Sequence, residues 1–504
     1  MKRAYISVFD KTGIIELGKK LDKAGWEIIS TGKTCAMLNE SGISAIESST
    51  LTGFSELLDG KVKSLHPKIF ANILATPEEA KTLEEPPFSL VVVNLYPFEN
   101  YRDKRAELTT LLKNIDIGGV SLLRAGAKNF ENVAVVCDPK DYGIDFENID
   151  LKTRERLAIK VFETTSKYDF LIFDELGKNF TKGEDAGTLS DAEAFWFEKV
   201  QELRYGENPH QKANLYLNSA ENRALDYEIL NGKELSYNNI IDTSAALDVA
   251  SEFYDVNCAV IVKHTNPCGV ALGPTLDDAW YRALDCDPLS AFGGIVAFTQ
   301  GVDAALAKRL TSMFLEVVAA PAFLDGALEI LKTKKNLRVV KINTPLKEYK
   351  SFASKEVRIT PFGALIQEKD NVELSPNKFS IMTKIKPTTE QIEDMIFALK
   401  VVKHLKSNAI VIAKDLRTLG ICGGQTSRIG AVEVAMNRVC DTCKGAVLAS
   451  DGFFPATDNI EIAATHRIAA IIQPGGSIKD QDVIDAANKY GLCLINTGVR
   501  HFKH

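Results

Sequence analysis

The chain has 504 residues, of which 45% are hydrophobic and 25% are charged, and its formal net charge is −7. This length exceeds a single hydrophobic core and predicts several domains, while the acidic balance argues against a general nucleic-acid binder. The sequence has neither a long apolar run nor a basic, apolar N-terminal segment, so we expect no membrane span, no secretion and a cytoplasmic location.

Residues 1–140 alternate between β-type apolar runs and helical patterns. Strands are expected at 4–10, 26–30, 90–98 and 133–138, and helices at 13–25, 34–42 and 116–129. Such alternation predicts a parallel sheet with helices on both faces, where ligands bind beyond the carboxyl ends of the strands. Polar clusters follow three of these strands, at 10–12, 30–34 and 94–96.

The stretch "EIISTGKTCAML" (27–38) has the strand, loop and helix order of a nucleotide-binding P-loop. The P-loop also needs a glycine five residues before Gly32, and Glu27 stands there, so the ATPase interpretation fails on spacing. A Ser-Thr-Gly-x-Thr loop at a helix N-terminus still offers backbone N–H groups and hydroxyls to an anion. We therefore expect an anion site.

A helical pattern near 151–178 is followed by the polar segment 177–191, which we interpret as an inter-domain linker. Further strand–helix units begin at "CAVIVKH", "GGIVAFT", "NAIVIAK" and "AAIIQPGG", without a repeat of fixed period. These features predict domains at 1–193 and 194–504.

Nine cysteines, an odd number spread along the chain, suit a reducing compartment better than a disulfide framework. Only Cys440 and Cys443 have the Cys-x-x-Cys spacing of a redox or metal site, and no second pair accompanies them. We expect no required metal ion, although a bound monovalent cation remains open.

Several long motifs resemble one known family. "GKVKSLHPKIFANILA", "NLYPF" and "IDIGGVSLLRAGAKN" resemble the cyclohydrolase half of the bifunctional AICAR formyltransferase/IMP cyclohydrolase family of purine biosynthesis, in which AICAR is phosphoribosylaminoimidazolecarboxamide. "LRYGENPHQKANLY", "KHTNPCG", "SAFGGIVAF", "KSNAIVIAK", "GGQTSRIG", "DGFFP", "QPGGS" and "TGVRHFKH" resemble its transformylase half. The motifs occur in the family's order over nearly the whole chain.

The resemblance implies an α/β fold: an N-terminal methylglyoxal-synthase-like domain with a parallel sheet, then a transformylase of two cytidine-deaminase-like subdomains. It implies the last two steps of purine synthesis, which are formyl transfer from 10-formyltetrahydrofolate to AICAR and dehydrating ring closure to IMP. It also implies a homodimer with small-molecule substrates, and no nucleic-acid or membrane partner.

In the N-terminal half the resemblance implies that the strand-end loop holds the nucleotide 5′-phosphate. The implied nucleotide contacts are Ser7, Asp10, Lys11, Thr12, Thr31, Gly32, Thr34, Lys61, Ser64, Asn94 and Ile117. Two residues depart from the family, since Lys33 replaces a usual glycine and Phe9 a frequent serine. Lys33 either adds charge to the phosphate site or points into solvent.

Ring closure needs attack of the carboxamide nitrogen on the formyl carbon, stabilisation of an oxyanion and loss of water. By resemblance, Lys128 at a helix end is the candidate for proton transfer and Lys63 for oxyanion stabilisation. Tyr96 and Asp116 would orient the amide.

Formyl transfer needs a base for the amine proton and a cation for the tetrahedral oxyanion or for N10 of the folate. Lys263 and His264 follow the strand "CAVIV" and supply both groups, provided that the strand ends there, as the following Thr-Asn-Pro-Cys-Gly predicts. The implied AICAR contacts are Arg204, Tyr205, Gly293, Glu316, Asn408, Arg428 and Arg500, and the implied folate contacts are Ile429, Phe453, Asp458, Asn459, Ser477 and Ile478.

Two alternatives stay open at this stage. One is a nucleotide-sensing or scaffold protein that keeps the fold without catalysis. The other is methylglyoxal synthase activity of the N-terminal domain.

Overall fold

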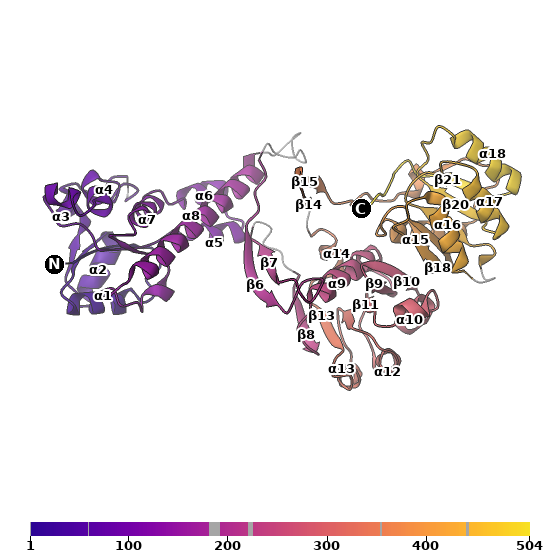
Figure 1. Cartoon of the computed structure of the whole chain (residues 1–504), viewed down its shortest axis with the longest axis horizontal. Coiled ribbons are helices and arrows are strands. Elements are labelled where there is room, and N and C mark those ends of the chain that lie inside the picture. Colours follow the sequence, from indigo (N-terminus) through magenta and orange to yellow (C-terminus); the bar gives the residue numbers. More distant parts are fainter. Residues whose placement is uncertain (1, 59, 181–191, 220–224, 353–354, 440–442) are drawn as a thin grey trace. The chain divides into compact units, whose positions relative to one another are not determined.

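The computed structural model describes every residue except 1, 59, 181–191, 220–224, 353–354 and 440–442 (Figure 1). The chain divides into two compact units, Met1–Glu198 with Asn218–Asn222, and Lys199–Leu217 with Arg223–His504. Most of the polar segment interpreted as a linker lies outside the described residues. Its first four residues belong to the end of a 30-residue helix, α8 (Leu151–Phe180), which the sequence predicted as a helical stretch near 151–178.

The first unit contains a five-stranded, fully parallel sheet. Its strands, in spatial order, are β3 (Ala45–Glu47), β2 (Glu27–Ser30), β1 (Arg3–Val8), β4 (Leu90–Asn94) and β5 (Ala134–Val136). The four strands expected from the sequence are confirmed. The edge strand β3 was not predicted, because three partly exposed residues carry too little apolar pattern to stand out from a loop.

Helices cover both faces of this sheet, as the alternating pattern predicted. On one face, α1 (Ile14–Lys23) and α2 (Gly32–Glu40) contribute buried leucines and isoleucines to a common core. On the other, α4 (Pro67–Leu74), α7 (Gly118–Lys128) and α8 pack against β4 and β5. Three shorter helices lie nearby, α3 (Ser48–Thr52), α5 (Phe98–Asp103) and α6 (Leu108–Lys113).

The second unit is organised around a mixed sheet of twelve strands in the order β16-β21-β20-β19-β17-β18-β10-β9-β11-β12-β13-β8. The outermost strands are β8 (Tyr227–Asn231) and β16 (Ser380–Ile381). Two hairpins lie apart from this sheet, β6 (Phe197–Leu203) with β7 (Ala213–Asn218), and β14 (Lys355–Thr360) with β15 (Gly363–Glu368).

The ten central strands fall into two halves with the same topology, as the two similar subdomains implied by the resemblance predict, although no repeat of fixed period marks them in the sequence. Each half runs helix, β-hairpin, helix, strand, helix, strand, helix, strand, and the last three strands are parallel to one another. The first half contains α9 (Tyr237–Ala250), β9 (Cys258–Lys263), β10 (Asn266–Leu272), α10 (Leu276–Leu284), β11 (Ile295–Phe298), α12 (Ala304–Leu310), β12 (Val317–Ala320), α13 (Ala327–Lys332) and β13 (Arg338–Ile342). The second contains α15 (Thr389–Val402), β17 (Ile410–Lys414), β18 (Arg417–Cys422), α16 (Arg428–Asn437), β19 (Val447–Ser450), α17 (Asp458–Thr465), β20 (Ala470–Gln473), α18 (Asp480–Tyr490) and β21 (Cys493–Asn496).

The halves meet where β10 pairs antiparallel with β18, at Ala271 opposite Arg417. One face of the sheet carries a single continuous core that includes α9 and α15. The opposite face carries two separate cores, one under α10, α12 and α13 and the other under α16, α17 and α18. The two cores of this face therefore stop on either side of the β10–β18 junction, which leaves room for a cavity there.

Among the helices of the described residues, none is both long and apolar enough to cross a membrane.

Candidate active sites

The first candidate site lies at the carboxyl ends of β1, β2 and β4, where the parallel sheet was expected to bind its ligand. The Ser7 and Thr31 hydroxyls are 3.0 Å apart, which joins the ends of β1 and β2. Asn94 at the end of β4 accepts the Asp10 N–H at 2.9 Å and donates to the Asp10 carbonyl at 2.9 Å. The three predicted polar clusters are thus brought together.

The loop before α2 lies at the helix N-terminus where an anion cradle was expected, and some of its donors are engaged within the protein. Thr34 is buried and donates to the Val8 carbonyl at 3.2 Å. The Gly32 N–H donates to the Glu47 carboxylate at 2.9 Å. A carboxylate therefore occupies one of the backbone donors that the cradle would offer to a phosphate, and sequence reasoning did not single out Glu47.

Three lysines gather beside this cradle. The pKa of Lys11 is lowered, first by burial of its ammonium group and then by the positive charges of Lys63 and Lys33. The Lys11 ammonium also donates to the carbonyls of Val8 and Phe9. Such convergence of like charges favours an anionic ligand. Lys33, the residue that departs from the family, is exposed but contributes to this positive field.

Asp116 and Tyr96 form the other side of the site. Burial raises the pKa of Asp116, although hydrogen bonds from the Gly119 and Tyr96 backbones and the charge of Lys63 oppose this rise. Burial and the nearby Asp116 raise the pKa of Tyr96. Lys63, Tyr96 and Asp116 thus lie close enough to influence one another electrostatically.

Other predicted contacts surround this group. Thr12 caps its own turn by donating to the Asp10 carboxylate at 2.7 Å, and Ser64 is buried against the first residue of α7. Ile117 and Lys61 are exposed. The Phe9 ring meets the Tyr96 ring edge-on, with centroids 5.3 Å apart, and provides an aromatic wall.

Lys128 is not brought to this group within one chain. α7 begins beside Asp116 and runs for 11 residues to Lys128, which is exposed at the other end of the helix. At 1.5 Å per residue this separation is about 15 Å. The following Asn129 donates to the Ile73 and Ala75 carbonyls at the far end of α4, which confirms the direction of α7.

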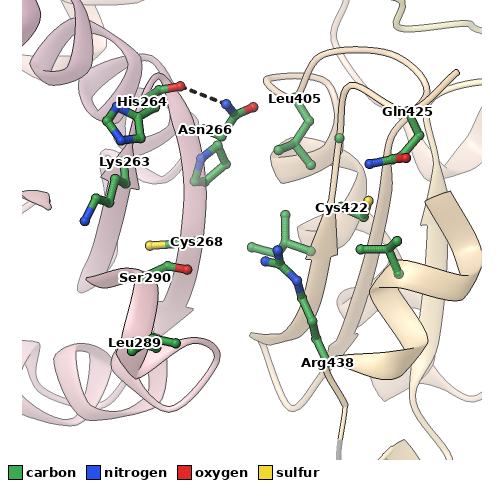
Figure 2. A pocket seen from close by; sticks show the side chains of 14 residues that line it. Lys263, His264, Asn266, Cys268, Leu289, Ser290, Leu405, Cys422, Gln425 and Arg438 are labelled. Carbon is green, nitrogen blue, oxygen red and sulfur yellow. Dashed lines mark hydrogen bonds between the residues drawn. The ribbon is translucent and has the colours of Figure 1, made fainter. Parts of the chain in front are cut away.

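The second candidate site lies at one edge of the twelve-stranded sheet. Lys263 is the last residue of β9, so the predicted end of that strand is confirmed. β10 starts and β18 ends at the same edge, because both pair antiparallel with their neighbours. A cavity of about 440 Å³ opens there. Figure 2 shows Lys263, His264 and Cys268 on one side of the cavity and Leu405, Cys422 and Arg438 on the other.

Lys263 and His264 are held differently. The Lys263 ammonium donates to the Phe292 carbonyl at 2.5 Å and lies beside Gly293. His264 lies in the two-residue turn between β9 and β10, with a positive φ of 53°. Its carbonyl accepts from the Asn266 side chain at 2.8 Å (Figure 2). His264 is exposed and lines the cavity together with Lys263.

The remaining predicted AICAR contacts lie on both sides of the β10–β18 junction. Glu316 precedes β12 and accepts from Asn239 at 2.8 Å. Asn408 donates to the carbonyl of Gln425, a residue that lines the cavity. Arg428 is buried and bound to Asp451, and its buried Nε has no hydrogen-bond partner among the described residues.

Three arginine and tyrosine contacts lie on loops. Arg204 is exposed, and its guanidinium lies 5.7 Å from the Tyr205 ring. Arg500 is also exposed and lies 4.4 Å from the Phe502 ring. Exposed guanidinium groups on aromatic rings are kept extended and remain available to an anion.

The predicted folate contacts follow β19 and β20. Phe453 is 37% exposed and Ile478 is fully exposed. Asn459 is buried with one amide oxygen unpartnered among the described residues, and it donates to Asp458 at 2.6 Å. Ser477 lies just before α18, and Ile429 lies in the first turn of α16.

These contacts cannot all meet in one chain. Glu316 at β12 and Ser477 after β20 are separated by seven steps between neighbouring strands. At a spacing of about 4.8 Å this amounts to roughly 34 Å across the sheet. The predicted residues therefore form two groups, one around Lys263 and one around Phe453.

Sequence reasoning missed part of the cavity. Cys268, Leu289 and Ser290 lie within or beside the quoted motifs but received no role, and Arg438 lies outside them. Burial raises the pKa of Cys268 to about 12, so this thiol does not supply a thiolate near neutral pH.

Across the described residues, no group of three His, Cys, Asp or Glu side chains could hold a metal ion. Cys440, the first cysteine of the Cys-x-x-Cys pair, lies outside those residues, and Cys443 is buried.

The fold is α/β in both units, and each unit contains a group of the predicted site residues. Comparison with known families agrees: residues 13–121 match the MGS-like domain and residues 126–438 match the AICARFT/IMPCHase bienzyme. The chain belongs to this bienzyme family of purine biosynthesis, which unites AICAR formyltransferase and IMP cyclohydrolase.

Full-length relatives support this membership. Proteins described as bifunctional purine biosynthesis protein PurH are 45% identical in Acetivibrio thermocellus, 47% in Caldicellulosiruptor saccharolyticus and 46% in Aquifex aeolicus. In each case the alignment covers 100% of this chain and 100% of the relative. A solved structure titled "Crystal structure of ForH" is 28% identical, with a TM-score of 0.32, and covers 36% of this chain and 99% of that one.

We expect Lys63→Ala to slow cyclisation of supplied formyl-AICAR by about 10²-fold or more, the usual cost of losing an oxyanion donor. Lys128→Ala should cost much less, because α7 carries that residue away from Asp116. Steady-state formation of IMP, followed by absorbance, measures both. An equal loss in both variants would contradict this geometry and require Lys128 to reach a site by another route.

Proposed function

We propose that the chain formylates the 5-amino group of AICAR with 10-formyltetrahydrofolate and then closes the ring of formyl-AICAR to IMP. The observation that carries this proposal is the cavity lined by Lys263 and His264 in a chain of the bienzyme family. Family membership supports a folate-type formyl donor, and the specific donor is part of our proposal. We also place the protein in the cytoplasm, where purine precursors are made.

Lys263 and His264 divide the chemistry of formyl transfer. The AICAR amine donates its lone pair into the ring and carboxamide, so attack requires loss of its proton as the new C–N bond forms. His264 is exposed at the cavity and accepts that proton. Lys263 then stabilises the tetrahedral oxyanion or protonates the folate nitrogen that leaves.

We assign binding of the nucleotide to Arg204, Arg428 and Arg500. Arg204 and Arg500 are exposed, so their guanidinium groups are available for phosphate and carboxamide, whereas Arg428 is buried and bound to Asp451. The residues around Phe453 would hold the folate.

In the first unit, the cradle of Thr31, Gly32 and Thr34 would hold the phosphate of formyl-AICAR, with positive charge from Lys11. Lys63 would stabilise the oxyanion, and Tyr96 and Asp116 would orient the carboxamide. Binding of a phosphate requires the Glu47 carboxylate to release the Gly32 N–H.

The protein is further proposed to be a homodimer. The β14–β15 hairpin exposes Ile359 at 79%, Leu365 at 61% and Phe362 completely, an apolar set that favours burial against another surface. The separation of roughly 34 Å between the two groups of predicted contacts also favours a site completed by a second copy.

We expect His264→Ala and Lys263→Ala each to lower turnover of formyl transfer by about 10²-fold or more, because each removes a group that acts in the transition state. The KM for AICAR should change much less, since the arginines bind the phosphate. Initial rates with AICAR and 10-formyltetrahydrofolate provide the measurement. Cyclisation of supplied formyl-AICAR serves as the internal control and should be unaffected. Full turnover in folded His264→Ala would reject His264 as the base.

Separate expression of the two proposed domains tests their independence and the oligomeric state together. Residues 1–193 should cyclise formyl-AICAR, and residues 194–504, which carry the β14–β15 hairpin, should formylate AICAR and form a dimer by light scattering. A folded but inactive 1–193 would refute the proposed boundary. A monomeric 194–504 with full activity would refute the dimer-completed site.

A further inference from the structure

Two side chains of helix α9 form hydrogen bonds with the segments that carry the predicted site residues His264 and Glu316. Asp242 accepts the backbone N–H of Thr265 at 2.7 Å, in the turn that carries His264. One turn earlier on the same side of the helix, Asn239 donates to Glu316 at 2.8 Å. Asn239 is itself fixed, because it completes the capping box with Ser236 at the start of α9. The turn that carries His264 and the predicted nucleotide contact Glu316 are thus both hydrogen-bonded to one helix.

The turn needs such support. His264 and Thr265 have φ values of 53° and 64°, in the left-handed region that glycine and asparagine adopt most readily. A β-branched residue such as Thr265 is disfavoured there, so the local sequence does not select this conformation by itself. An acceptor fixed outside the turn is therefore required to keep His264 at the mouth of the cavity.

The second half of the sheet contains an equivalent turn fixed by an aspartate, without the proposed catalytic residues. Asp394 in α15 accepts the N–H groups of Asp415 at 3.0 Å and Leu416 at 2.6 Å. Those two residues form the β17–β18 turn, with φ values of 54° and 57°. Asp242 and Asp394 each lie six residues after the cap of their helix, Ser236 and Thr388. Only the first copy carries a Lys-His pair.

We propose that Asp242 is a positioning residue for formyl transfer, which fixes the β9–β10 turn so that the His264 imidazole faces the cavity. This inference rests on the proposed function of His264. The surroundings of Asp242 agree with it: burial raises its pKa, backbone donors of Thr265 and His264 and the charge of His264 oppose that rise, and the negative Glu316 adds to it.

The experiment compares two conservative variants that separate the position of the Asp242 carboxylate from its charge. Asp242→Asn keeps an acceptor oxygen in place but loses the charge, whereas Asp242→Glu keeps the charge but moves the carboxylate by one methylene. We expect Asp242→Glu to lower the kcat of formyl transfer by about tenfold to 10²-fold, the cost of misplacing a reacting group by about 1 Å. The loss of kcat in Asp242→Asn should be at least fivefold smaller than in Asp242→Glu, and the KM for AICAR should change little in both variants.

The matched controls are Asp394→Asn and Asp394→Glu, which alter the equivalent turn far from the Lys-His pair. Any effect on thermal stability should be similar in the two halves, whereas only the Asp242 variants should lower kcat. Equal kcat losses at both positions, a larger loss in Asp242→Asn than in Asp242→Glu, or parental kcat in both Asp242 variants would overturn the inference. His264→Ala, measured in parallel, tests the proposed function itself, since full turnover there removes the base irrespective of Asp242.

Discussion

The pairing of β10 with β18 is the contact on which the second unit depends. Thr418, which is fully buried, accepts the Val270 N–H at 2.9 Å and donates to the Val270 carbonyl at 3.1 Å, so its hydroxyl completes the junction between two half-sheets. This antiparallel register places the start of β10 beside the end of β18. Lys263 and His264 consequently lie on the opposite side of the cavity from Cys422 and Arg438, and the cavity needs both halves.

The duplicated topology shows that the left-handed turn belongs to the fold, and that the proposed catalytic residues use one of its two copies. Both halves fix a left-handed two-residue turn through an aspartate on the preceding helix, and both bring a helix very close to a strand at a glycine. A Cβ on Gly269 would lie 2.0 Å from the Ala283 carbonyl, and one on Gly420 would lie 2.5 Å from the Ala435 carbonyl. The shared fold requirements are therefore met twice, and the site uses only one copy of the turn.

Much of the fold follows from the sequence because buried strands are apolar over their whole length. "LVVVN" and "CAVIV" were predicted as strands on that ground. The residues of β10 were predicted to end the preceding strand, because their Asn-Pro start resembles a loop. Proline is nevertheless tolerated at the start of a strand, next to the hairpin turn. The two halves were expected from the family resemblance and not from a sequence repeat, because "KHTNPCG" and "KDLRTLG" share only the lysine and the glycine.

The sites were only partly predictable for a different reason. Residues adjacent to strand ends, such as Asn94 and Lys263, were located because strand ends determine position. Glu47, Arg438 and Asp242 come from an edge strand, a helix end and a supporting helix, where the sequence carries no local signal of contact with the site. Lys128 lies at the other end of α7 from Asp116, and its role in ring closure stays a prediction.

The central claim is that one chain performs both reactions rather than sensing the nucleotide. Mass spectrometry of the nucleotides formed from AICAR and 10-formyltetrahydrofolate by the purified full-length chain tests it most directly. We expect IMP to form in equal amount to the AICAR consumed, with tetrahydrofolate as the other product. Tight binding of AICAR with no formyl-AICAR or IMP would contradict the account and identify a nucleotide-binding protein without catalysis.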